Sequence, residues 1–174
     1  MYSINSTKYN YYIIETIKVI IGAFVIGASA QISIPLKPVN ITLQTMVVMA
    51  IGLTYSKQSS FYTMGLYLTL GVLGLPVFTN WHSGLAVLGG PSAGYLIGML
   101  AASYIMPFLR ERYNTSDFYN CLLGSFVIYV LGISWLSTFV GIRSALYSGF
   151  LVYVPTGLAK IALLVWILRL MRRG

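Results

Sequence analysis

The chain has 174 residues, of which 57% are hydrophobic and only 8% are charged, and its mean hydropathy is +0.80. A soluble domain carries about 25% charged residues because its surface must be hydrated, so this composition excludes a soluble globular protein and indicates a membrane protein. A single cysteine, Cys121, excludes a disulfide framework and a multi-cysteine metal site. The net charge of +8 does not indicate a nucleic-acid partner here, because the basic residues lie at the ends of apolar segments, where membrane topology explains them.

Six apolar segments follow one another along the chain, and a helix that crosses a bilayer needs about 20 such residues. We expect these helices at about 12–32, 39–55, 60–73, 88–109, 118–142 and 148–170. The first ends before Pro35 and Pro38, because proline disfavours a helix at its own position and at the residue before it. The sequence therefore predicts an all-α membrane protein, with residues 1–174 forming one domain of six transmembrane helices.

An alternative concerns the first of these segments. Residues 19–31 combine an apolar core with Ala28, Ser29 and Ala30, which resembles a signal-peptidase site. The apolar stretch is long and follows a tyrosine-rich, weakly basic sequence, so an intact first helix is the favoured interpretation.

The placement of lysine and arginine orients the six helices. Seven basic residues fall on one side of the membrane in this threading: Lys8, Lys57, Arg110, Arg112, Arg169, Arg172 and Arg173. Only Lys37 and Arg143 fall on the other side. Because basic residues favour cytoplasmic loops, both termini are predicted to be cytoplasmic, and the polar loop between the third and fourth helices is predicted to face outward.

The chain has little material for catalysis. Of its three acids, Glu15 lies far in the sequence from Glu111 and Asp117, and all three are near the predicted cytoplasmic helix ends. A membrane enzyme acting on a lipid-linked substrate would need clustered acids, histidines or a nucleophile with a base, so this alternative is disfavoured. No phosphate-binding P-loop motif is present, so uphill transport would need energy from a partner.

Lys160 is the ionisable side chain that best marks a binding site. It lies nine residues before Arg169, roughly 13 Å along a helix, too far to reach the cytoplasmic face easily. Pro155 suits the first turn of the last helix, which places Lys160 below the outer mouth. A lysine in this position either extends outward to water or binds an anion or a carbonyl group, and we favour the ligand.

The loop between the third and fourth helices carries further candidates. Asn80 and Trp81 form a polar and aromatic turn, which is either a solvated turn with an interfacial tryptophan or part of a binding site. Lone His82 has no second ligand to make a metal site. Gln44 points a polar amide from the start of the second helix toward the same mouth, where a neighbouring helix or a ligand can be its partner.

The first helix carries small residues at helical spacing: Ala23, Gly27 and Ala30. Such a stripe allows helices to approach closely. It serves either packing within the chain or docking of another membrane subunit.

Three stretches carry a resemblance to a known family: "QISIPLKPVNITLQT", "GLPVF" and "GGPSAGYLIG". They strongly resemble the BioY family, the biotin-specific substrate-binding S components of energy-coupling factor (ECF) vitamin transporters, in matching order from about residue 28 to 160. The resemblance implies six helices, cytoplasmic termini and a biotin pocket closed by outer loops. It also implies that the small-residue motif at Ala23, Gly27 and Ala30 contacts the coupling protein of an ATPase module, which some family members lack.

The resemblance includes departures from the family pattern. The family typically has Pro-Gly-Asp-x-x-Lys before its last helix, whereas this chain keeps Pro155 and Lys160 but has Gly157 at the aspartate position. Asn80 matches the loop asparagine of the family. The basic residue that the family has near the start of the fourth helix has no counterpart, since Gly94 and Tyr95 stand there.

Biotin offers a ureido ring, an apolar thioether ring and a carboxylate. Asn80 can pair with the ureido edge, while Trp81, Phe78 and Tyr95 can cover the apolar body. We therefore expect biotin uptake across the bacterial inner membrane by a multi-pass protein without a cofactor, an enzymatic activity or a metal, working with an ECF coupling protein and ATPases or by self-association. An S component for another small vitamin is the alternative.

Overall fold

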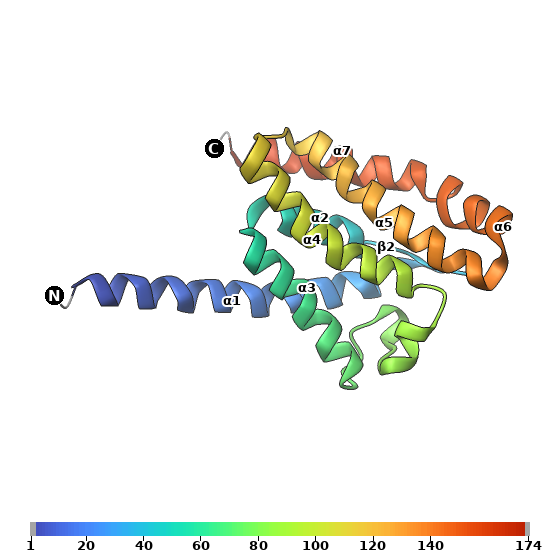
Figure 1. The fold of residues 1–174 in the computed structure, drawn as a ribbon, viewed down its shortest axis with the longest axis horizontal. Helices are drawn as coiled ribbons and strands as arrows, with labels where there is room; N and C mark the ends of the chain where they lie inside the picture. Colours follow the sequence, from blue (N-terminus) through green and yellow to red (C-terminus); the bar gives the residue numbers. More distant parts are fainter. Residues whose placement is uncertain (1–2, 173–174) are drawn as a thin grey trace.

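The computed structural model describes the backbone of residues 3–172 and the side chains of residues 10–172. Met1, Tyr2, Arg173 and Gly174 lie outside the described residues, as does the side chain of Lys8. Within residues 3–172 the regular secondary structure is helical apart from one short hairpin (Figure 1). The helices are α1 (Ser3–Gln31), α2 (Gln44–Thr54), α3 (Lys57–Val72), α4 (Ala93–Tyr113), α5 (Asp117–Val140), α6 (Ile142–Leu146) and α7 (Val154–Met171). Strands β1 (Ser33–Ile34) and β2 (Ile41–Thr42) pair antiparallel and form a short hairpin between α1 and α2.

Four helical stretches within the described part of the chain are long and apolar enough to cross a membrane. They cover Asn10–Gln31, Ala93–Tyr113, Asp117–Val140 and Ile142–Met171. The last combines α6, a π-helical turn at Tyr147–Leu151 and α7. Helices α2 and α3, with 11 and 16 residues, are shorter than the roughly 20 residues that a perpendicular span needs. The predicted fold class, an all-α membrane protein, is thus confirmed.

Two helices begin later than the sequence predicts. The second helix, expected from residue 39, begins at Gln44, because residues 41–42 pair with 33–34 around the two prolines of the connecting loop. The fourth helix, expected from residue 88, begins at Ala93, because Leu85–Gly89 forms a separate 3-10 turn before Gly90 and Pro91. In both places residues that look apolar enough for a helix instead form loop structure at the same end of the molecule.

Helix α4 lies in the middle of the bundle, between α3 and α5 (Figure 1). Its contact with α5 is close because Gly98 faces the backbone of Ile128, where a Cβ atom at residue 98 would lie 2.8 Å from the Ile128 Cα. Helix α1 packs along α3 with its C-terminal half, and its N-terminal half extends beyond the bundle (Figure 1). Close helix packing of this kind is typical of membrane proteins. Helices in lipid associate through van der Waals contacts, and small residues allow their backbones to approach closely.

The two ends of the bundle differ in charge. The termini lie at the same end as the α2–α3 and α4–α5 connections (Figure 1). This end carries ion pairs between Lys57 and Glu111 (3.5 Å) and between Arg172 and Asp117 (2.6 Å). The opposite end carries the β hairpin, the α3–α4 loop and the turn before α6 (Figure 1). Loops with little charge therefore surround one end of the bundle, and basic residues surround the other.

Candidate ligand-binding cavity

A cavity of about 340 Å³ lies at the hairpin end of the bundle. This volume falls in the roughly 300–1,000 Å³ range of small-molecule pockets. Its walls come from seven parts of the chain: the loop before β2 with β2 itself, α2, α3, residues 78–92, α4, α5, and α7 with the preceding Tyr153. The polar or ionisable lining residues are Asn40, Thr42, Gln44, Thr45, Tyr67, Thr79, Asn80, His82, Ser92, Tyr95, Ser125, Tyr129, Tyr153, Thr156 and Lys160.

Lys160 brings a positive charge into this cavity from α7. Its Nζ donates to the Thr42 carbonyl oxygen at 2.5 Å and to Thr45 Oγ1 at 3.3 Å. Both acceptors are neutral, and an ammonium group has three donors, so one remains for a ligand. The three acids of the chain pair with other cations: Glu15 with Lys18, and the two acids of the ion pairs described above. The cavity therefore holds a cation without an acidic partner, the arrangement expected for an anionic or strongly accepting ligand.

Gln44 lies where the sequence places it, at the first position of α2 and in the cavity wall. Its side chain is 2% exposed, and its amide nitrogen Nε2 has no hydrogen-bond partner among the described residues. A buried amide donor without an acceptor is costly, so an acceptor on a bound molecule would relieve that cost once the amide turns toward it.

Phe78 and Asn80 line the cavity from the α3–α4 loop. The Phe78 ring is 2% exposed and packs edge-on against Tyr67, with centroids 5.5 Å apart. Gly71 makes room for it, because a Cβ atom at residue 71 would lie 2.2 Å from the ring. Asn80 adopts a left-handed backbone conformation with φ 58°, and so does the next residue, Trp81, with φ 60°. The structure does not bring Trp81 into the cavity: its side chain is 69% exposed and is not part of the lining.

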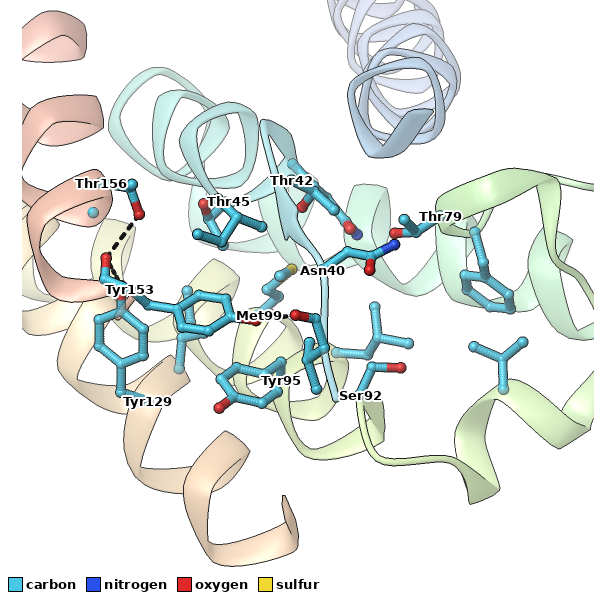
Figure 2. Close-up of a pocket in the computed structure, with 18 of the residues that line it drawn as sticks. Asn40, Thr42, Thr45, Thr79, Ser92, Tyr95, Met99, Tyr129, Tyr153 and Thr156 are labelled. Carbon is cyan, nitrogen blue, oxygen red and sulfur yellow. Dashed lines mark hydrogen bonds between the residues drawn. The ribbon is translucent and has the colours of Figure 1, made fainter. Parts of the chain in front are cut away.

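Three tyrosines form an aromatic wall in the cavity (Figure 2). Tyr95 and Tyr153 stack with ring centroids 6.3 Å apart and planes 21° apart. The Tyr95 hydroxyl donates to the Gly149 carbonyl oxygen at 2.9 Å, and the Tyr153 hydroxyl donates to the Val39 carbonyl oxygen. The Tyr129 hydroxyl donates to the Tyr153 carbonyl oxygen at 3.3 Å. These hydrogen bonds fix the rings so that their faces can cover an apolar ligand body.

The aromatic wall accounts for a glycine, rather than a residue with a side chain, at position 157. A Cβ atom at residue 157 would lie 2.6 Å from the Tyr129 hydroxyl oxygen, and both residues line the cavity. The absence of a side chain at residue 157 therefore leaves space for Tyr129, and it leaves Lys160, one helical turn later, without an acid beside it.

The sequence identified Lys160, Asn80, Gln44, Phe78 and Tyr95, and the structure brings all five into one cavity. The sequence pattern did not identify Tyr129 and Tyr153. A tyrosine in an apolar segment looks the same in the sequence whether it lines a pocket or packs against another helix. The sequence pattern also missed Thr42 and Thr45, although both lie beside Gln44 in one short stretch and that proximity was a usable signal.

The small-residue stripe of α1 lies inside the chain. Ala23 and Ala30 are 1% and 0% exposed, and Gly27 is buried with its Cα facing Val77, where a Cβ atom would lie 3.2 Å from the Val77 Cβ. This arrangement favours the alternative of packing within the chain, because a coupling subunit can reach these residues only if α1 separates from its neighbours.

Figure 2 shows that the cavity has two polar sides. Thr45 and Thr156 lie on one side, and Asn40 and Thr79 lie on the other, with Thr42 between the two pairs and the three tyrosines below. Lys160 belongs to the first side through its hydrogen bond to Thr45, and Asn80 follows Thr79 on the second. Among the described residues, no group of three histidine, cysteine, aspartate or glutamate side chains can hold a metal ion.

A helical membrane bundle with an amphipathic cavity of this size defines the chain as a membrane-embedded protein that binds a small molecule. Comparison with known proteins identifies the family. The family model described as "BioY family" matches residues 5–174, so the chain belongs to the BioY family.

Relatives and a solved structure agree with this assignment. The "Probable biotin transporter BioY" of Rickettsia prowazekii is 38% identical over 87% of this chain and 80% of its own length. The "Biotin transporter BioY" of Thermotoga maritima is 35% identical over 84% of this chain and 89% of its own. A crystal structure of the S-component for biotin from an ECF-type ABC transporter matches all of this chain and 95% of its own, with a TM-score of 0.77 and 27% identity. The expectation of a transport protein rather than an enzyme is thereby confirmed.

Proposed function

We propose that the chain is a biotin-specific S component that captures biotin in the cavity described above and delivers it across the membrane. Family membership and the named biotin transporters among its relatives support the substrate. The observation that carries the proposal is the cation of Lys160 in a tyrosine-walled cavity, where Thr42 and Thr45 supply only neutral acceptors. Biotin combines an anionic end with an apolar body and a polar ring, and such a cavity suits all three.

The proposed binding mode places one polar end of biotin on each polar side of the cavity. The carboxylate binds Lys160, whose third donor is free for it. Asn80 pairs with the ureido ring through its amide, and Gln44 supplies a further donor. Tyr95 and Phe78 cover the thioether ring. In the alternative mode Lys160 donates to the ureido carbonyl, and Lys37 or Arg143 near the mouth takes the carboxylate.

The proposed topology has six crossings, with both termini cytoplasmic and the cavity opening outward. Basic residues are frequent where α3 begins (Lys57), where α4 ends (Arg110 and Arg112) and where α7 ends (Arg169 and Arg172), and Figure 1 places these helix ends at one end of the bundle. The β1–β2 loop and α6, at the cavity end, carry only Lys37 and Arg143. The short helices α2 and α3 cross as part of the bundle. The protein accordingly resides in the bacterial inner membrane.

Cysteine labelling in cells tests this orientation. Ser83 is exposed in the α3–α4 loop, and Gln58 is exposed at the opposite end of α3. A membrane-impermeant maleimide is expected to label Ser83→Cys in intact cells and Gln58→Cys only after lysis. Native Cys121 is buried and gives a low background. Labelling in the reverse pattern would overturn the orientation.

The proposed partners are an ECF coupling protein and its ATPases, or a second copy of the chain where no such module exists. Because Ala23, Gly27 and Ala30 are buried, α1 offers a partner its opposite side, where Ile17, Ile21 and Phe24 are exposed. Lipid covers this surface in the absence of a partner.

Equilibrium binding of labelled biotin to the purified full chain tests the function. Saturable binding at submicromolar biotin, competed by unlabelled biotin and not by other water-soluble vitamins, is the expected result. No binding at micromolar biotin would overturn the proposal, and binding of another vitamin in its place would identify an S component of different specificity.

A further inference from the structure

Helix α1 and the α3–α4 loop meet at one side chain, that of Gln31. Its amide nitrogen Nε2 lies 3.0 Å from the Phe78 carbonyl oxygen, 3.3 Å from that of Val77 and 3.2 Å from that of Gly27. Its amide oxygen Oε1 accepts the Trp81 backbone N–H at 3.0 Å. Both ends of one amide group therefore bind the same short loop segment, residues 77–81.

This segment has a backbone that needs support. Asn80 and Trp81 are consecutive non-glycine residues with positive φ, a conformation that side chains bearing a Cβ atom disfavour. The loop contributes bonds of its own: among them, the Phe78 N–H donates to the His82 carbonyl oxygen at 3.1 Å, and the His82 ring Nδ1 lies 2.8 Å from the Thr79 carbonyl oxygen. The bond from the Trp81 N–H to Gln31 fixes the strained turn from outside the loop.

The supported segment forms part of the cavity, but Gln31 does not. Phe78, Thr79 and Asn80 line the cavity, whereas Gln31 is not a lining residue. Gln31 is also the last residue of α1, and only Ile32 separates it from β1, whose partner β2 supplies the Thr42 carbonyl oxygen to Lys160. The partly buried Gln31 thus connects α1 with the segment that carries Asn80, and it lies next to the hairpin whose Thr42 carbonyl oxygen binds Lys160.

We propose that Gln31 is a positioning residue that holds segment 77–81 over the cavity and thereby sets the rate at which the bound molecule leaves. The proposal rests on the proposed function in that the bound molecule is biotin. Gln31 acts through Phe78 and Asn80, without touching the ligand. Because α1 ends at Gln31, a shift of α1 breaks these bonds and loosens the segment, which links the position of α1 to the opening of the cavity.

The test uses Gln31→Met in the full-length chain in lipid nanodiscs. Methionine keeps the approximate size of glutamine and removes its hydrogen bonds. Ser29→Ala is the matched control, because Ser29 lies two residues earlier on α1 and its hydroxyl donates within the helix, to the Ile26 carbonyl oxygen at 2.7 Å. Two quantities are measured: the dissociation rate of labelled biotin, and the hydrogen exchange of peptides that cover residues 76–84 in the absence of biotin.

Gln31→Met is expected to speed biotin dissociation by about 10-fold or more, the effect of losing one or two hydrogen bonds. It is also expected to speed exchange in residues 76–84 selectively, and Ser29→Ala is expected to change neither quantity. Unchanged exchange in Gln31→Met would overturn the proposal. So would a lower fraction of active protein with an unchanged dissociation rate, since that result indicates a merely structural role.

The two measurements separate this inference from the proposed function. If the wild-type chain binds no biotin, the proposed function fails, and exchange in the ligand-free chain still decides whether Gln31 holds the segment.

Discussion

The two polar sides of the cavity are built in different ways. On one side Lys160 stands on a regular helix and donates to Thr42 on a strand and Thr45 on a helix. On the other side Asn80 stands on an irregular turn with positive φ, held by hydrogen bonds within the loop and by Gln31 from α1. The first side is part of the bundle, and the second depends on a contact between distant segments.

This difference assigns different roles to the two sides. A charge on a rigid element gives strong, oriented binding, because little order must be created when the ligand arrives. A polar group on a loop adds a weaker contact and can move to admit the ligand. We therefore expect substitutions on the Lys160 side to change affinity most, and substitutions on the Asn80 side to change it less.

The largest effect is expected from Lys160→Met. A hydrogen bond to a charged group contributes about 1.5–3 kcal/mol, so biotin affinity should fall roughly 10- to 150-fold. Methionine retains most of the packing of the aliphatic stem. Isothermal titration of the purified variant measures the loss, and an affinity within about 2-fold of wild type would show that the two sides do not differ as described.

Gly157→Asp sharpens the comparison by neutralising the charged side. An aspartate one turn before Lys160 provides an anion that competes with the ligand for the ammonium group. We expect biotin to bind about 10-fold more weakly than to the matched variant Gly157→Asn. Both substitutions meet the Tyr129 hydroxyl in the same way, so the difference between them isolates the charge. Equal affinities would show that Lys160 does not hold an anion.

On the loop side, Asn80→Gly removes the amide while keeping a residue that adopts positive φ without strain. The loss of one neutral hydrogen bond predicts biotin affinity about 2- to 12-fold weaker. Asn80→Ala should cost more than Asn80→Gly, because it adds backbone strain to the same loss. If the glycine variant bound biotin as weakly as Lys160→Met, the two sides would contribute equally to affinity, and the difference described above would be contradicted.

The smallest effect is expected from Trp81→Phe. The Trp81 side chain is exposed and lies outside the cavity lining, so biotin affinity should remain within about 2-fold of wild type. Direct titration checks this expectation, and a loss of affinity comparable to that of Asn80→Gly would show that the indole contacts the ligand.

The sequence predicted the charged side better than the loop side, and the reason is physical. Lys160 was visible because an ionisable residue deep in an apolar helix needs a partner, a rule that depends on local sequence alone. The structure then supplied its acceptors, Thr42 and Thr45, which lie more than a hundred residues away. Trp81 was predicted to cover the ligand because it lies next to Asn80 in the sequence. The direction of a side chain in a turn depends on φ, however, and the sequence shows neither the positive φ of Trp81 nor the bond from its N–H to the distant Gln31.

The same reasoning applies to the fold. Hydropathy located the helices, because lipid requires long apolar segments with internal hydrogen bonds. It placed the starts of α2 and α4 too early, because residues 39–43 and 88–92 adjoin apolar segments but belong to the hairpin and loop that line the cavity. The buried stripe of α1 was open to two interpretations, since small residues pack equally well against the same chain and against a partner.

The central claim, that Lys160 holds the carboxylate of biotin, is tested most directly by a cycle of four affinities. Biotin and its uncharged amide are titrated against the wild-type chain and against Lys160→Met. The account predicts that the wild type prefers biotin to the amide and that Lys160→Met loses this preference. If Lys160→Met instead weakens both ligands by the same factor, the carboxylate assignment is contradicted and Lys160 donates to the ureido carbonyl.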